Sequence, residues 1–286
     1  MALFKKEKKE LEPQYYLSAT NIPTYNYKVY YMKPVEKLLY FLVAFAVGAV
    51  VGYLFYGGIG KDEFGEPTTL TYILNVLIST SVGVIAGVMF LPIRTQQIIA
   101  KKQGVLKSQF RDMLESLTTS LGAGKNVTDS FKTIYDDLKV QYEEDAYILK
   151  ELEVIISGMA NNIDVEDILE DFGRRSGIGD IESFANVFRI CYRKGGNIKD
   201  TIRSTHEILS DKMEIAEDIE TVVTGSKNEQ NIMVVMPILL IGMIKLMSED
   251  FANNFTTPTG IISTTIAIAM FVASYFIGKS VLNIKV

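Results

Sequence analysis

The sequence predicts an all-α, polytopic membrane protein with four transmembrane helices and a six-helix up-and-down cytoplasmic bundle between spans 2 and 3. Two observations predict this fold class. Four apolar segments are long enough to cross a bilayer, and the polar stretch between the second and the third repeats one helix-start pattern three times. The composition agrees, because 48% hydrophobic and 22% charged residues indicate a mixture of membrane-embedded and water-exposed parts.

The composition also excludes several classes of protein. The single cysteine rules out an internal disulfide framework and a cysteine-based zinc site. The net charge of −5 argues against binding to nucleic acid, which needs a basic face. We therefore expect no nucleic-acid partner.

A cytoplasmic N-terminal arm, residues 1–37, precedes the first apolar segment. It carries a lysine-rich start and then six tyrosines. An arm of this length is too long for the charged region of a cleavable signal peptide. The uncharged segment 38–56 is therefore predicted to be a permanent anchor and the first half of transmembrane hairpin 1, residues 38–93.

The remaining predicted spans cover residues 70–93, 232–247 and 261–278, and the last two form transmembrane hairpin 2, residues 232–282. The connection 57–69 is mainly acidic, and the connection 248–260 has no basic residue. Basic residues flank the opposite ends of the spans: Lys28, Lys33, Lys37, Arg94, Lys101, Lys102, Lys107, Lys279 and Lys285. Chain segments beside a membrane span that are rich in lysine and arginine stay on the cytoplasmic side of the membrane. We therefore expect a multi-pass protein of the cytoplasmic (inner) cell membrane, with both termini and the middle domain in the cytoplasm.

Several residues within the predicted spans indicate how the membrane helices bend and pack. Pro237 predicts a kink in the third span, and Lys245 near its end is expected to extend toward the membrane interface. Small residues four positions apart predict close helix packing, within one chain or between chains. They are Gly48 and Gly52, Gly83 and Gly87, and Ser274 and Gly278.

The middle domain, residues 94–231, is predicted to contain six helices, at 95–122, 126–141, 144–160, 164–175, 179–194 and 197–230. Three of them start at a residue that can cap a helix, namely Asn126, Asp164 and Asn197. Each cap is followed three positions later by an aspartate, which the helix dipole favours. Glycine or asparagine residues, which accept left-handed backbone conformations, precede each cap.

Since the first helix leaves the membrane and the sixth returns to it, these three turns lie at the end of an up-and-down bundle that is far from the membrane. We expect this end to contact a partner. The predicted contact residues are Gly122, Gly124, Asn126, Asn162, Asp164, Gly195, Gly196 and Asn197.

No catalytic set emerges from the sequence. The only histidine, His206, has no partner placed to form a nucleophilic or metal-binding set, and 122–125 (GAGK) lacks the first glycine and the final hydroxyl residue of a phosphate loop. We therefore expect no enzyme, cofactor or metal ligand. The last predicted helix carries a stripe of acidic residues. Three interpretations of this stripe stay open: a solvated face, a cation site, or a docking surface for a basic partner. The stripe comprises Glu207, Asp211, Glu214 and Asp218.

The order of several short motifs resembles the type II secretion system F family, and within it the tight-adherence (Tad) pilus platform proteins. The motifs are 123–127 (AGKNV), 168–177 (ILEDFGRRSG), 180–181 (DI) and 195–198 (GGNI). The matching residues include Arg174, Arg175, Asp180 and Pro237. Two features depart from the family pattern: 211–214 (DKME), where relatives carry arginines, and the tyrosine-rich arm.

The resemblance implies a membrane platform or adaptor protein of a Tad (Flp) type IV-like pilus or type II secretion machine. Such a protein couples a hexameric secretion ATPase to the extraction and assembly of pilin subunits, and assembles with a paralogous platform protein or with itself. The alternative is a transmembrane subunit of a transporter or channel. Its polar site would use Asn75 and the cluster 79–81 in the second span.

Overall fold

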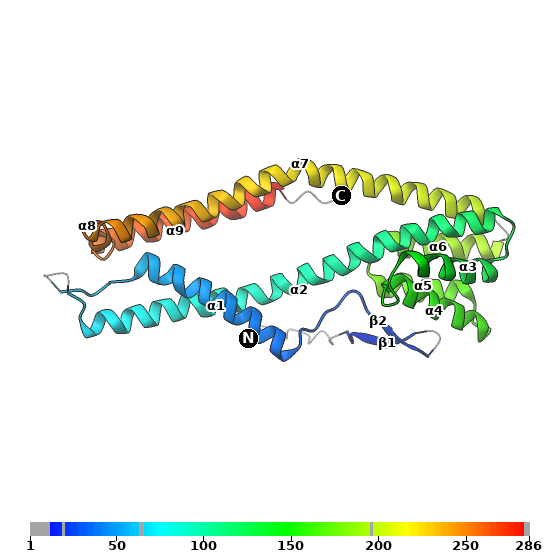
Figure 1. Ribbon diagram of the computed structural model, residues 1–286, viewed down its shortest axis with the longest axis horizontal. Coiled ribbons are helices and arrows are strands. Elements are labelled where there is room, and N and C mark those ends of the chain that lie inside the picture. Colours follow the sequence, from blue (N-terminus) through cyan, green and yellow to red (C-terminus); the bar gives the residue numbers. More distant parts are fainter. Residues whose placement is uncertain (1–11, 19–20, 63–65, 195–196, 283–286) are drawn as a thin grey trace, which may run out of the picture. The chain divides into compact units, whose positions relative to one another are not determined.

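The computed structural model describes residues 12–18, 21–62, 66–194 and 197–282, and these residues are almost entirely helical (Figure 1). Two short strands precede the helices and pair in antiparallel register, with Tyr15 opposite Tyr25. The elements are β1 (Tyr15–Leu17), β2 (Pro23–Tyr25), α1 (Pro34–Tyr56), α2 (Thr69–Gly122), α3 (Val127–Gln141), α4 (Tyr147–Ala160), α5 (Val165–Ser176), α6 (Gly179–Lys194), α7 (Ile198–Met247), α8 (Glu249–Asn254) and α9 (Pro258–Leu282).

Four of these helices, α1, α2, α7 and α9, are long and apolar enough to cross a membrane. This finding confirms the prediction of a multi-pass, mainly helical membrane protein. The predicted second span and first domain helix, 70–93 and 95–122, form one helix of 54 residues, α2, and the predicted sixth domain helix and third span, 197–230 and 232–247, form one helix of 50 residues, α7. The helix α2 continues through Pro92, although a proline removes one backbone hydrogen bond. The short helix α8 was not expected.

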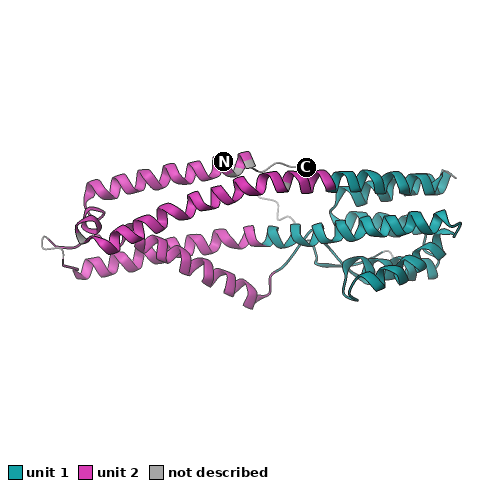
Figure 2. Cartoon of the chain, turned by 45° about the horizontal axis from the view of Figure 1, so that its top comes forward, with its two compact units in different colours: residues 1–31, 95–213 teal, residues 32–94, 214–286 magenta. Residues whose placement is uncertain are grey.

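The chain divides into two compact units (Figure 2). Unit 1 combines the chain up to Tyr31 with Thr95–Met213, and unit 2 combines Met32–Arg94 with Glu214–Val286. The arm up to Tyr31 therefore belongs to the same unit as the helices of the middle domain.

The core of unit 1 contains one face of each helix. The apolar residues of α2 recur every three or four positions from Leu106 to Leu117, which places them on a single stripe. Phe110 of this stripe packs edge-on against Phe172 of α5 and Phe184 of α6. Gly173 allows α5 and α6 to approach closely, because a Cβ atom there would lie 2.9 Å from the Cα of Glu182.

Glycines hold α1 and α2 together in unit 2. A Cβ atom at Gly48 would lie 2.7 Å from the Cβ of Ala86, and one at Gly83 would lie 2.8 Å from the carbonyl oxygen of Phe45. Gly52 and Gly87 also face the partner helix at short distances. The expected close packing of the first two spans is thus confirmed within one chain.

Lys245, near the end of α7, has partners inside unit 2. Its ammonium group donates to the carbonyl oxygen of Leu54 at 2.7 Å and lies 4.4 Å from the centre of the Phe255 ring. Leu54 lies in the last turn of α1, where free carbonyl groups and the helix dipole favour a cation. The lysine that was expected to extend toward the interface therefore joins α7 to the end of α1.

The glycine contact makes a prediction for unit 2. Gly83→Leu forces a side chain into the backbone of α1, so we expect a loss of stability of about 1–3 kcal/mol, as for other overpacked sites. The matched change Val84→Leu, at an exposed neighbouring position, should leave stability nearly unchanged. Thermal unfolding of the detergent-purified chain measures both, and equal midpoints would contradict the close contact.

Candidate functional site

Two of the three predicted helix caps make the expected side-chain hydrogen bond. The side-chain oxygen of Asn126 accepts a hydrogen bond from the backbone amide of Asp129 at 2.8 Å, and that of Asn197 accepts one from Asp200 at 3.3 Å. Asp164 is the N-cap residue of α5, as expected, but its side chain makes no capping hydrogen bond. The amide of Asp167 instead binds the backbone carbonyl of Asp164 at 3.0 Å, which satisfies it without the carboxylate.

The turns before α3 and α5 use left-handed backbone conformations, as expected. Gly124 has φ +85° and Asn162 has φ +60°. A Cβ atom at Gly122 would lie 3.6 Å from the side chain of Lys199, so the turn before α3 lies beside the start of α7.

The start of α5 lies at the same end of unit 1. Glu166 in its first turn accepts a hydrogen bond from Arg193 in the last turn of α6 at 3.0 Å. The predicted contact residues Gly122, Gly124, Asn126, Asn162, Asp164 and Asn197 thus belong to one end of unit 1, called the three-turn end below. Gly195 and Gly196 lie outside the described residues.

Arg175, one of the residues that carry the motif resemblance, is buried in the core of unit 1. Its guanidinium group donates to both carboxylate oxygens of Glu151, at 2.9 and 2.7 Å, and to Asp171 at 2.8 Å. A further N–H group donates to the backbone carbonyl of Tyr25 at 3.0 Å. These acidic partners raise the pKa of Arg175, although burial alone would lower it. Arg175 therefore stays charged and joins α4, α5 and the N-terminal arm.

Tyr27 completes this network from the arm. Its hydroxyl group donates to Glu151 at 2.9 Å, and its backbone amide donates to the carbonyl of Arg175 at 3.0 Å. Burial and the neighbouring Glu151 carboxylate raise the pKa of Tyr27, so the hydroxyl keeps its proton. We call the set of Tyr27, Glu151, Asp171 and Arg175 the arm network.

The other arm tyrosines extend this attachment. The rings of Tyr15, Tyr25, Tyr27 and Tyr147 form a chain of edge-to-face contacts, with centroids 5.1–5.5 Å apart. Lys102 of α2 donates to the hydroxyl of Tyr25 at 2.7 Å. Its ammonium group also lies 4.3 Å from the centre of the Tyr30 ring. The tyrosine-rich arm, which the family pattern left unexplained, is thus part of the fold of unit 1.

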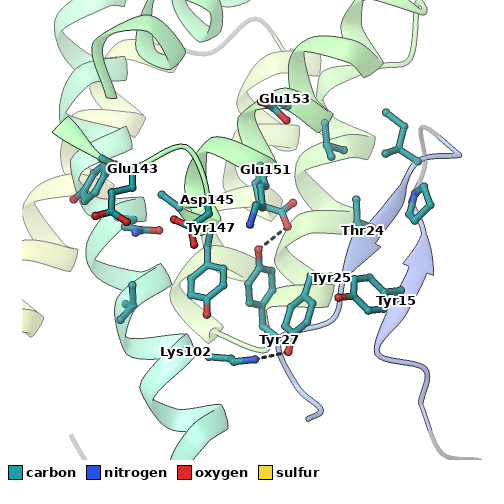
Figure 3. Close-up of a pocket in the computed structure, with 18 of the residues that line it drawn as sticks. Tyr15, Thr24, Tyr25, Tyr27, Lys102, Glu143, Asp145, Tyr147, Glu151 and Glu153 are labelled. Atoms are coloured by element: carbon teal, nitrogen blue, oxygen red, sulfur yellow. Dashed lines mark hydrogen bonds between the residues drawn. The ribbon is translucent and has the colours of Figure 1, made fainter. Parts of the chain in front are cut away.

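A pocket of about 1000 Å³ opens between the arm, α2, the connection before α4, and α4 itself. We call it the arm pocket. Figure 3 shows Tyr27 and Tyr25 between the strands on one side and Glu143 and Asp145 on the other. Its charged lining residues are Lys102, Glu143, Asp145, Lys150, Glu151 and Glu153.

Tyr142 fixes the connection that forms one wall of this pocket. Its hydroxyl group donates to Asp112 of α2. Burial and this hydrogen bond raise the pKa of Tyr142 to about 12. The wall is therefore held by a neutral hydroxyl over the physiological pH range.

Asp180, a second motif residue, joins three helices of unit 1. Its carboxylate lies 3.0 Å from the ammonium group of Lys107 in α2 and 2.5 Å from that of Lys212 in α7. Burial by itself raises the pKa of Asp180, but the hydrogen bonds from the two lysines lower it below its ordinary value. Lys212 comes from the segment 211–214, which departs from the pattern of the resemblance. Its ammonium group binds Asp180 within unit 1.

The other two motif residues differ from these. The Arg174 side chain is 68% exposed and pairs only weakly with Asp171, at 3.4 Å. Pro237 lies inside α7 and lines an apolar cavity of about 560 Å³ in unit 2. In the described part of the chain, no group of three or more His, Cys, Asp or Glu residues is arranged to hold a metal ion.

No family model matches the chain, and comparisons with curated proteins and with solved structures gave no significant match.

The arm network makes a prediction for unit 1. Arg175→Met leaves Glu151 and Asp171 without their buried cation, so we expect a loss of about 3–5 kcal/mol and faster tryptic cleavage at Lys28 of the arm. Adding Glu151→Met should recover part of this loss, because the pair is then removed together. Unfolding of the full chain and timed digestion measure these effects.

The exposed neighbour provides the control for this experiment. Arg174→Met should change stability by no more than about 0.5 kcal/mol. If the two arginine variants behave alike, the buried network does not attach the arm.

Proposed function

We propose that the protein is a membrane platform of a Tad-type pilus or related secretion machine, and that it couples a hexameric ATPase in the cytoplasm to the extraction and assembly of pilin subunits. The observation that carries this proposal is the three-turn end. Helix ends from separate parts of the sequence meet there, in a unit whose first and last long helices, α2 and α7, each continue into an apolar segment. The resemblance of the motifs supports the same class of protein.

The mechanical argument starts from helix continuity. A helix transmits displacement along its axis because each turn is hydrogen-bonded to the next. A partner that moves the three-turn end would therefore act on the apolar parts of α2 and α7 through continuous helices, in which Pro92 and Pro237 each remove one backbone hydrogen bond. Asp180 adds stiffness, since it ties both helices to α6 through Lys107 and Lys212.

The transporter alternative finds less support. Asn75 of the second span accepts a hydrogen bond from the backbone amide of Gly58 at 2.9 Å, and Ser81 donates to Leu77 of its own helix at 2.7 Å. Asn75 and Ser81 therefore already have partners, whereas the buried hydroxyl group of Ser79 has none among the described residues. A solute site at the middle of the membrane needs polar groups that are available to the solute.

The proposed partner surface makes a prediction. Lys125→Glu reverses an exposed charge beside Asn126, so we expect at least tenfold less secretion ATPase to co-purify with the full chain. Lys139→Glu, an equal change near the other end of α3, should retain the ATPase. Quantitative pull-down from membranes measures both, and identical recovery would place the contact elsewhere.

The proposed orientation makes a second prediction. In a Cys191→Ser background, a cysteine at Asn254 should react with an impermeant maleimide added to intact cells, because the connection 248–260 is expected outside. A cysteine at Asp145 should react only after the cells are opened. The opposite pattern would reverse the orientation.

A further inference from the structure

We propose that the arm pocket binds a basic peptide segment, the lysine- and arginine-bearing cytoplasmic flank of a single-span membrane protein. This inference rests on the proposed function, in which such a protein is the subunit that the platform moves. It assigns a substrate-binding role to a surface distinct from the three-turn end.

The charges of the pocket support a cationic ligand. Four carboxylates and two ammonium groups line it, which leaves an excess of negative charge. Glu151 is neutralised by Arg175, and Lys102 is held by the arm tyrosines. The exposed charges that remain are three carboxylates, those of Glu143, Asp145 and Glu153, and one ammonium group, that of Lys150.

The aromatic lining supports the same ligand. Tyr15, Tyr142 and Tyr147 line the pocket, and the first of them is 61% exposed. Cations bind over tyrosine rings, and carboxylates nearby strengthen their attraction. Lys102 already makes this contact within the chain, with its ammonium group 4.8 Å from the centre of the Tyr25 ring. An incoming lysine or arginine would find equivalent partners on the open side.

The position of the pocket residues in the sequence points to a membrane protein as the source of this segment. Tyr27 precedes α1 by only seven residues, and Lys102 follows the predicted second span by nine. A partner that crosses the same membrane carries its own lysines and arginines on the cytoplasmic flank. An anionic lipid headgroup carries the wrong charge for this lining.

The pocket is prepared for binding before a ligand arrives. The arm network holds Tyr25 and Tyr27 in place, and the hydrogen bond from Tyr142 to Asp112 holds the opposite wall. A preformed site loses little conformational freedom on binding, which favours affinity.

A defined probe tests the proposal. The probe is a fluorescent peptide with about 20 leucine and alanine residues, enough to span a bilayer, and a Lys-Lys-Ala-Lys-Lys flank; a second peptide carries a Gly-Ser flank. Binding to the full chain in neutral detergent is followed by fluorescence anisotropy. We expect the basic flank to bind at least tenfold more tightly, and we expect this preference to be lost in E143Q/D145N/E153Q.

The acidic stripe of α7 provides the matched control. E207Q/D211N/E214Q removes the same number of carboxylates and should keep the preference. The proposal is overturned if neither chain distinguishes the flanks, if the pocket variant keeps the preference, or if the α7 variant loses it. The pocket variant should unfold at the temperature of the unaltered chain, because Gln at position 153 still accepts the hydrogen bond from Tyr135.

The chain's own lysines are the competing occupant. Lys5, Lys6, Lys8 and Lys9 precede the described arm, so a chain without residues 1–11 is tested with the same peptides. Unchanged affinity supports a ligand from another protein, whereas a tenfold gain would show that this segment fills the pocket and would overturn the proposal. ATPase recovery is measured in parallel, so that failure of the pocket and failure of the platform are distinguished.

Discussion

The buried charge of Arg175 is the constraint on which the arrangement of unit 1 depends. Removing a guanidinium group from water costs several kcal/mol unless its N–H groups and its charge find partners. Here those partners come from α4, α5 and the arm, through Glu151, Asp171 and the carbonyl of Tyr25. Since each contributes to the same cation, the loss of one leaves the others in an unfavourable environment.

This requirement gives the arm a single position. Tyr27 binds Glu151 through its hydroxyl group and Arg175 through its backbone amide, so a shift of the arm by one residue would break both hydrogen bonds. The short strands could not fix this position alone, because an isolated two-stranded hairpin is only marginally stable in water. The buried ion pair thus specifies where the tyrosines, and with them one wall of the arm pocket, are placed.

The sequence predicted the features that depend on neighbouring residues. Apolar periodicity identified the helices of unit 1, the length of the apolar segments identified four possible spans, and the caps at Asn126 and Asn197 were found from residue type and spacing. The role of Tyr27 was missed, because its partner Glu151 lies 124 residues away. Six tyrosines in a polar arm were the available signal, but tyrosine alone does not identify its partner.

The arm network connects the two surfaces to which we assign partners, since Tyr27 and Glu151 themselves line the arm pocket. Helix α4 starts at Tyr147, which lines the arm pocket, and ends at Ala160, next to the three-turn end. Its 14 residues span about 21 Å at 1.5 Å per residue, and Glu151 lies in the second turn. A ligand that pulls on the arm therefore acts on Glu151 and Arg175, and through them on α4 and α5. Both helices lead directly to the three-turn end, so the same buried charges that fix the fold also provide a rigid connection between the two surfaces.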